Sequence, residues 1–550
     1  MARVGLGQYP SSKPASSKAG LGPGQLRYND QSPSRSSEEF RAATHHEGWK
    51  DLMTLSRRSL LAGVAALPIL ATGCVKTGWP DSPESPLFFE RTRRRSARKV
   101  FPHYFGQLPR SLDNSPTPDY YDREYLRVAG ESGKHAAYGG YLRDRPLPRT
   151  PIAGDYEFED ATWDIRTAMA MGADGFFVNI TGIEGSTWNR YQKLLAAAEA
   201  FDGEFFLIPM IDTAGGNMAS RTPLEIASAL ASFIGRPSSY EEEGKFVLAC
   251  FKAEGFSVQR WQDIIAVLGN LIGAPVCFMG ILLNPSRETI ATYAPISDYL
   301  GNWVIGADPA MLAATDNTAG RAPGLAREAG CKWVGTSHTQ IVVPYAQHYF
   351  HEAANSGALR QSWWKIIEQS ADHVQCVTWC DFSEGGQLTP SVARGWSSIA
   401  ITAYYLERYK FGRFPRITRD VLFLSHRNEP LVGVSYQSGQ TEFMNQQEQS
   451  YMTPVQDRVE ALTYLTAPAD VTVSVGGVLH EYRAPAGESV RTFPNALGSV
   501  SGWFARNGSV LGEVTSPFPV TSRPVSQDRQ YFFVSTLHGT EDQRHNLIHL

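Results

Sequence analysis

The sequence predicts an α/β protein with a (β/α)8 TIM barrel followed by a C-terminal antiparallel β-sandwich domain. From residue 99 onward, short apolar runs alternate with segments of helical periodicity, which is typical of parallel β/α architecture. Eight such runs precede residue 380, and eight strands close a barrel of this kind. After residue 431 the runs alternate apolar and polar residues and break at turns, which predicts the sandwich.

The predicted strands and helices follow in regular order. Thr222 and Glu225 have capping-box spacing, with Pro223 at the first helical position. Ser257 precedes another helix with one apolar face, and residues 391–409 predict a closing helix. The strands are expected at 100–105, 175–180, 205–211, 246–251, 276–283, 301–305, 332–336 and 374–379.

The chain divides into five predicted parts. We expect a catalytic barrel over 99–430 and a β-sandwich accessory domain over 431–550. A linker rich in Pro, Ser and Arg covers 77–98, and a targeting segment covers 53–76. Because an export signal begins a chain, we expect translation to start at Met53, with 1–52 disordered or a mis-assigned start.

The targeting segment predicts export to the periplasm, cell surface or exterior. Arg57 and Arg58 precede an apolar run over 60–71, as in a twin-arginine signal, and the run is too short to span a bilayer. The following Ala-Thr-Gly-Cys74 resembles a lipoprotein processing site, although Leu70 lies one place early. A lipid anchor at Cys74 is thus the one expected link to a membrane, and its presence stays open.

Composition narrows the functional classes. Hydrophobic residues make up 42% and charged residues 19%, so we expect a folded chain, and the net charge of -4 gives no basic footprint for nucleic acid. The 12 tryptophans serve either core packing or stacking on sugars. The cysteines beyond Cys74 lie in apolar runs without metal-ligand spacing, so we expect buried free thiols at Cys250, Cys277, Cys331, Cys376 and Cys380.

Two acids follow the eighth predicted strand. Asp381 and Glu384 are three residues apart at the strand's carboxyl end, where barrels of this kind carry their active sites. Cleavage of a glycosidic bond needs two carboxyl groups, and burial with mutual repulsion can keep one protonated. A solvated or capping pair is the structural alternative, but the position beside Trp379 favours catalysis.

Further polar and aromatic residues fall near the same ends of the predicted strands. Loop caps or salt bridges are the structural alternatives for the acids, and structural hydrogen bonding is the alternative for the histidines. No phosphate loop or metal cluster occurs, so we expect no cofactor and no metal. The substrate-binding candidates are His103, Tyr104, Asn179, Asp212, Glu254, Trp303, His338 and Trp379.

Several segments resemble motifs of one known family. The segment KVFPHYF at 99–105 is similar to its VFAH motif, and GADGFFVNI at 172–180 to its GIDGFALN stretch. FKAEG at 251–255 is similar to its TFxGEG, and TWCDFSE at 378–384 to its SWNDYGES. These motifs, spread over roughly 99–430, resemble glycoside hydrolase family 71, the fungal-type α-1,3-glucanases or mutanases.

The resemblance implies a reaction and a substrate. The acids of the last motif match at Asp381 and Glu384 and are implied to catalyse an inverting hydrolysis of α-1,3-glucan, without a covalent intermediate. The motif departs at Cys380, Ser383 and Gly385, where the family has Asn, Gly and Ser. Two alternatives stay open: a hydrolase of another polysaccharide, such as a bacterial exopolysaccharide, and a non-catalytic surface polysaccharide-binding lipoprotein.

Overall fold

A closed barrel of parallel strands forms the larger half of the protein. The computed structural model describes residues 87–92, 95–112, 119–149, 151–303, 318–345, 348–446, 453–540 and 543. The predicted segments 1–52 and 53–76, with Arg57, Arg58 and Cys74, lie outside these residues. No helix in the described ranges is long and apolar enough to cross a membrane.

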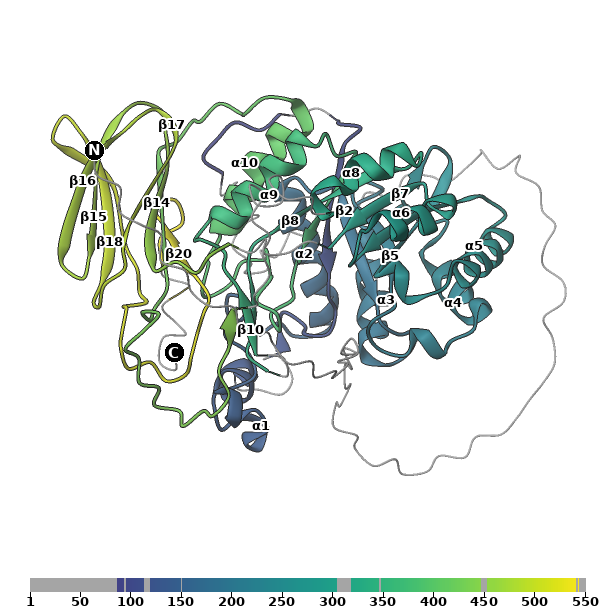
Figure 1. Ribbon diagram of the computed structural model, residues 1–550, viewed down its shortest axis with the longest axis horizontal. Helices are drawn as coiled ribbons and strands as arrows, with labels where there is room; N and C mark the ends of the chain where they lie inside the picture. The colour runs from purple at the N-terminus through teal and green to yellow at the C-terminus, as the bar shows by residue number, and fades with distance from the viewer. Residues whose placement is uncertain are drawn as a thin grey trace, which may run out of the picture.

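All eight predicted strand segments form strands of the barrel, shown in Figure 1. The strand order is β3-β2-β1-β11-β8-β7-β6-β5, and pairing of β3 with β5 closes the ring. The short β4 (Glu241–Glu242) extends β5 in the antiparallel sense. The barrel strands are β1 (Lys99–Tyr104), β2 (Gly175–Ile180), β3 (Phe206–Asp212), β5 (Lys245–Phe251), β6 (Val276–Leu282), β7 (Tyr299–Asn302), β8 (Lys332–His338) and β11 (His373–Val377).

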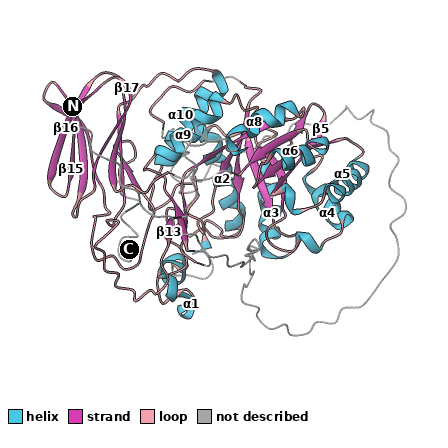
Figure 2. Ribbon diagram, viewed as in Figure 1, coloured by secondary structure: helices cyan, strands magenta, loops and turns pink. Residues whose placement is uncertain are grey.

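Helices follow the barrel strands in sequence, and Figure 2 shows them gathered in this half of the molecule. The predicted capping box forms, with Thr222 and Glu225 bonded reciprocally, and Ser257 caps the next helix by accepting from the Arg260 amide. The longer helices are α2 (Tyr156–Met171), α3 (Gly185–Glu199), α4 (Pro223–Leu230), α5 (Val258–Ile272), α6 (Arg287–Tyr293), α8 (Thr318–Glu328), α9 (Gly357–Glu368) and α10 (Ser397–Phe411).

Short elements lie in the connections between strands and helices. The connection after β8 contains β9 (Ile341–Val343) and β10 (Tyr349–His351), which pair with each other and, through β10, with β13 (Asn445–Gln446). The short helix α1 (Gly130–Gly133) lies in the connection after β1. Single turns of 3-10 or π type occur at Tyr121–Leu126, Ala136–Tyr138, Met218–Ser220, Ala231–Phe233, Ala253–Gly255 and Ala294–Ile296.

Two four-stranded sheets form the C-terminal β-sandwich, with orders β17-β14-β12-β20 and β16-β15-β18-β19. All pairings within them are antiparallel, as predicted. The first strand, β12, precedes residue 431, where the sequence pattern placed the start of this domain. The strands are β12 (Val421–His426), β14 (Arg458–Leu465), β15 (Ala469–Val475), β16 (Val478–Ala484), β17 (Gly487–Pro494), β18 (Val500–Arg506), β19 (Ser509–Thr515) and β20 (Phe532–Ser535).

Side chains at every second position of the strands fill the interior of the barrel. The same alternation determines which side chains face the barrel axis at the carboxyl ends of the strands. One buried cluster takes every second residue of the strands, for example Val247 and Ala249 with Phe251 packed against them. The residues between them, such as Leu248 and Cys250, join the cluster shared with the helices. Since the side-chain period of a strand is two, the residue two places after each interior residue also faces the barrel axis.

Candidate active site

Asp381 lies buried in the loop after β11 and is held by the backbone around it. Its Oδ1 accepts from the Ser383 hydroxyl at 2.6 Å, the Ser383 amide at 3.0 Å and the Glu384 amide at 3.2 Å. The Asp381 amide donates to the Thr378 hydroxyl at 3.0 Å. These bonds fix the carboxyl group and leave Oδ2 without a hydrogen bond to any described residue.

Glu384 shares this loop but has a different environment. Its backbone carbonyl accepts from the Val342 amide of β9 at 2.8 Å, whereas no described residue donates to its carboxyl group. Burial, followed by the charges of Asp381 and Asp212, raises the pKa of Glu384 to about 8. These surroundings favour the protonated form of Glu384.

The two acids differ in how readily they ionise. Burial also raises the pKa of Asp381, but the hydroxyl of Ser383 and the amides of Ser383 and Glu384 oppose that shift. No donor opposes the shift for Glu384. The hydrogen bonds to Asp381 therefore favour its ionised form, whereas the surroundings of Glu384 favour its protonated form.

Asp212 is a third carboxyl group near the pair, at the end of β3. Its Oδ1 accepts from the amides of Ala214 and Gly215 at 2.8 and 2.9 Å, and its Oδ2 accepts from Asn179 Nδ2 at 3.2 Å. Burial raises the pKa of Asp212, and its charge in turn contributes to the raised pKa of Glu384. The predicted site residues Asp212 and Asn179 thus lie together beside Glu384.

Aromatic and imidazole rings occupy the next places around the barrel mouth. The His103 and Trp303 rings have centroids 5.1 Å apart and perpendicular planes, and Phe251 lies 4.6 Å from Trp303. Burial lowers the pKa of His103 and of His338 to about 3, so both imidazoles are neutral. The structure places His103, Trp303 and His338 on inward-facing positions, and their contact with substrate stays a prediction.

Three predicted substrate-binding residues have other roles in the structure. The Trp379 indole is fully buried in the layer between strands and helices, 5.3 Å from the Phe176 ring, which corrects the expectation that it faces substrate. Tyr104 alternates outward from His103, packs on the same Phe176 ring and points its hydroxyl to Asp164 at 3.4 Å. Neither ring lines the barrel axis.

Glu254 likewise stabilises a loop. Its Oε1 accepts from the amides of Leu283 and Asn284, both at 2.8 Å, and so caps the connection after β6. This is the structural alternative that the sequence left open for Glu254. The acids that influence the pKa of Glu384 are Asp381 and Asp212.

Tyrosines near the acid pair were not predicted. Burial raises the pKa of Tyr345 and Tyr349, and the carboxylates of Glu384 and Asp381 raise both further. Tyr141 also has a raised pKa, to which Asp381 contributes, and its ring lies 4.9 Å from that of Tyr345. These tyrosines come from the connections after β1 and β8, where the sequence shows no strand-end pattern, so no sequence signal pointed to them.

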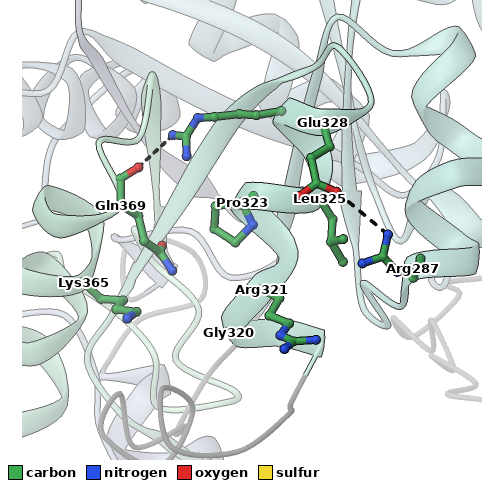
Figure 3. Close-up of a pocket in the computed structure, with 10 residues that line it drawn as sticks. Arg287, Gly320, Arg321, Pro323, Leu325, Glu328, Lys365 and Gln369 are labelled. Atoms are coloured by element: carbon green, nitrogen blue, oxygen red, sulfur yellow. Dashed lines mark hydrogen bonds and ion pairs between the residues drawn. The ribbon is translucent and has the colours of Figure 1, made fainter.

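The pocket shown in Figure 3 lies elsewhere on the molecule. Its walls come from α6, α8 and α9, where Arg287 approaches Glu328 at 3.9 Å and Arg327 donates to the Gln369 carbonyl at 2.7 Å. None of the candidate site residues lines it. This pocket therefore has no part in the chemistry of the acid pair.

A (β/α)8 barrel with two neighbouring carboxyl groups after its last strand is an arrangement typical of one class of enzyme, the glycoside hydrolases. The profile of Glycosyl hydrolase family 71 matches residues 150–542, and the chain belongs to this family. A mutanase of Penicillium rubens is 23% identical over 389 residues, which cover 66% of this chain and 81% of the relative. The predicted class and family are therefore confirmed.

Solved structures of other glycoside hydrolases are similar at low identity. The GH99 endo-alpha-mannosidase from Bacteroides thetaiotaomicron aligns with a TM-score of 0.43 and 14% identity, over 57% of this chain and 98% of that chain. A glycosyl hydrolase family 2 member from Bacteroides cellulosilyticus aligns with a TM-score of 0.35 and 12% identity, over 65% of this chain and 43% of that chain.

Proposed function

We propose that this glycoside hydrolase cleaves α-1,3-glucan with inversion, with Glu384 as general acid and Asp381 as general base. The observation that carries the proposal is the unequal hydrogen bonding of the pair, with three donors on Oδ1 of Asp381 and no described donor on the carboxyl group of Glu384. Glu384 has a pKa raised to about 8, while three donors favour the ionised form of Asp381. Hydrolysis of a glycosidic bond needs an acid and a carboxylate at once with either stereochemical outcome, and the resemblance to the family motifs is what supports inversion.

The reaction follows from these states. Glu384 donates its proton to the glycosidic oxygen as the bond from C1 to that oxygen breaks. Asp381 takes a proton from a water molecule through Oδ2, and the water oxygen bonds to C1 from the opposite face. The products are a free hydroxyl on the leaving sugar and a hemiacetal of inverted configuration, and the reaction leaves Asp381 protonated and Glu384 ionised.

The relative named a mutanase and the family motifs support α-1,3-glucan as substrate. Release of reducing sugar from a panel of α-1,3-glucan, α-1,4-glucan, β-1,3-glucan and bacterial exopolysaccharides tests this choice. We expect release from α-1,3-glucan. Release from another glycan alone would overturn the substrate, and no release from any glycan would favour the non-catalytic binding protein.

Inversion has its own test. Proton NMR of the first product from α-1,3-linked oligosaccharide distinguishes the two anomers before they equilibrate. An inverting enzyme releases the β-anomer first. An initial α-anomer would show retention and would require one of the acids to act as a nucleophile.

We also propose that the protein is exported, with Arg57 and Arg58 as the signal and Cys74 as a lipid attachment site. The support is the order of a twin arginine, a short apolar run and a cysteine. Cell fractionation with mass spectrometry of the mature N-terminus tests both points. A cytoplasmic protein that keeps residues 53–76 would contradict export, and an exported protein without a lipid on Cys74 would contradict the anchor alone.

A further inference from the structure

The sandwich sheet with the order β16-β15-β18-β19 has one face on the sandwich core and one face away from it. Val471 of β15 and Phe504 of β18 point into that core. The other sheet covers the core from the opposite side, and its Phe423 and Tyr464 join the buried cluster of the barrel. Figure 1 shows β15, β16 and β18 at the end of the molecule opposite the barrel. The face of this sheet that points away from the core, here called the outer face, carries Thr472, Ser474, Glu481, Ser501, Trp503 and Glu513.

Trp503 lies at the centre of the outer face. It pairs with Thr472 of β15 on one side and with Glu513 of β19 on the other. Because side chains alternate along a strand and Phe504 points into the core, the indole of Trp503 points outward. The side chain is half-buried and belongs to none of the apolar clusters formed by the described residues. Packing of a core therefore does not explain this ring.

The polar side chains around the ring have hydrogen-bonding capacity that the protein does not use. Thr472 is 8% exposed, yet its hydroxyl forms no hydrogen bond with any described residue. Buried polar groups normally have such a partner. The carboxylates of Glu481 and Glu513 are exposed and likewise form no ion pair or hydrogen bond within the described part of the chain. An aromatic face and three unused polar groups thus lie together.

These groups form one straight row across the sheet. The register places Glu481 opposite Thr472, Thr472 opposite Trp503, and Trp503 opposite Glu513. Neighbouring strands lie about 4.8 Å apart, so the row spans about 14 Å. The outer face therefore offers an extended polar track with a flat ring in its middle, which suits a polymer better than a small molecule.

The charge and composition of the outer face exclude other classes of partner. Its two acids are unpaired, whereas the neighbouring Arg483 is bonded to Asp470 at 2.7 Å, so the face repels nucleic acid and anionic lipid. Protein interfaces have an apolar core that is depleted in charged residues, and one ring between two acids does not supply it. A neutral polysaccharide fits, because its CH faces stack on an indole and its hydroxyls donate to carboxylates.

We propose that the outer face, with Trp503 as its platform, is a second binding site for the glucan substrate. The identity of the polymer rests on the proposed function. Because the other sheet of the sandwich shares a buried cluster with the barrel, a glucan bound on the outer face is held beside the catalytic domain. Binding at two places on one polymer raises the local concentration of glucan at the acid pair.

The test is depletion of the full chain from solution by particles of α-1,3-glucan, with Asp381→Asn in every sample to prevent hydrolysis. We expect Trp503→Ala to weaken binding about tenfold, because it removes the stacking ring. Trp503→Tyr keeps a ring and should retain most of the affinity. Thr472→Val preserves shape on the strand and should weaken binding about threefold through loss of the hydroxyl.

Trp364→Ala is the matched control. Trp364 is a tryptophan of α9 that is 39% exposed and lies on the barrel. Its removal should leave depletion by the particles unaltered. Wild-type binding by both Trp503→Ala and Thr472→Val, or an equal loss in Trp364→Ala, would overturn the inference. Dimers in sedimentation velocity that Trp503→Ala dissociates would assign the outer face to a second copy of the chain and would also overturn it.

The stability of the variants is checked beside their binding. Trp503 belongs to no apolar cluster of the described residues, so Trp503→Ala should melt with the parent chain. If Trp503→Ala instead failed to fold, Trp503→Tyr and Thr472→Val would decide the matter. Retained binding in the first together with weaker binding in the second supports the inference, and wild-type binding in Thr472→Val contradicts it.

A second measurement separates this inference from the proposed function. Reducing-sugar release by the chain with both acids intact is compared on particles of α-1,3-glucan and on soluble α-1,3-linked oligosaccharide. We expect Trp503→Ala to lower the ratio of the two rates about fivefold, and an unaltered ratio would overturn the inference. If the wild type cleaved neither substrate, the proposed function would fail, and depletion by the particles would still decide whether Trp503 binds glucan.

Discussion

Three donors converge on one oxygen of Asp381, whereas no described residue donates to the carboxyl group of Glu384. Asp381 is buried and Glu384 is half-buried, and this removal from water raises the pKa of both acids. The donors break this symmetry in favour of the Asp381 carboxylate, and its charge then helps to keep Glu384 protonated. The proposed roles of the two acids thus follow from the unequal number of hydrogen bonds that their carboxyl groups accept.

The pH dependence follows from these protonation states. Glu384 must carry its proton, so its contribution to kcat/KM is complete well below its pKa of about 8 and is lost as the pH rises through that value. Asp381 must be ionised, so activity is lost on the acidic side as it takes up a proton. We expect a bell-shaped profile with its alkaline limb near pH 8. A flat profile up to pH 10 would contradict the assignment of Glu384.

The leaving group distinguishes the acid from the base. A nitrophenol leaving group needs little protonation, so Glu384→Gln should lose far less activity on nitrophenyl α-1,3-oligosaccharides than on glucan. Asp381→Asn should be impaired on both substrates, because water must be activated in each case. Steady-state kinetics of the two variants on the two substrates give the comparison. The reverse pattern would exchange the roles of the two acids.

At the scale of single elements, the sequence predicted correctly where the barrel strands lie. It predicted less well which way the side chains at the ends of those strands point. The sequence located all eight barrel strands, and with them the mouth where His103, Asn179 and Asp212 lie. Tyr104 follows His103 by one residue and therefore faces the helices. Trp379 lies beyond the last residue of β11, where strand alternation no longer fixes its direction, and packs in the core.

The burial of Trp379 has a measurable consequence. We expect Trp379→Ala to lower the free energy of unfolding by about 3–5 kcal/mol, because it leaves a large cavity beside Phe176. Trp364→Ala is the control, since that side chain is 39% exposed and should cost less than half as much. Denaturant unfolding of both variants provides the values. Equal costs for the two would contradict the placement of Trp379.

At the scale of the whole molecule, the sandwich is continuous with the barrel. Phe423 and Tyr464 of the sandwich belong to the same buried cluster as barrel residues. The ion pair of Glu352 and Arg427 joins the connection after β8 to the segment that follows β12. Contacts of this kind join residues 75 positions apart, as the hydrogen bond from Arg427 to Glu352 does. Local periodicity carries no information on such pairings, so the sequence predicted the two domains but not the contacts between them.

Breaking the buried ion pair should be costly. We expect Arg427→Met to destabilise the protein by about 3–5 kcal/mol, because it leaves the Glu352 charge buried without its partner. Arg483→Met removes a comparable pair with Asp470 that is more than half exposed, and should change stability by less than about 1 kcal/mol. Thermal unfolding compares the two variants. Similar losses would argue against a buried pair at this interface.

The central claim is that Asp381 and Glu384 together hydrolyse a glucan. Hydrolysis of α-1,3-glucan by Asp381→Asn and Glu384→Gln, measured as reducing sugar beside the wild type, tests it most directly. We expect each variant to lose about 100-fold or more in kcat while circular dichroism and the melting temperature show an intact fold. Wild-type turnover in both variants would contradict the claim.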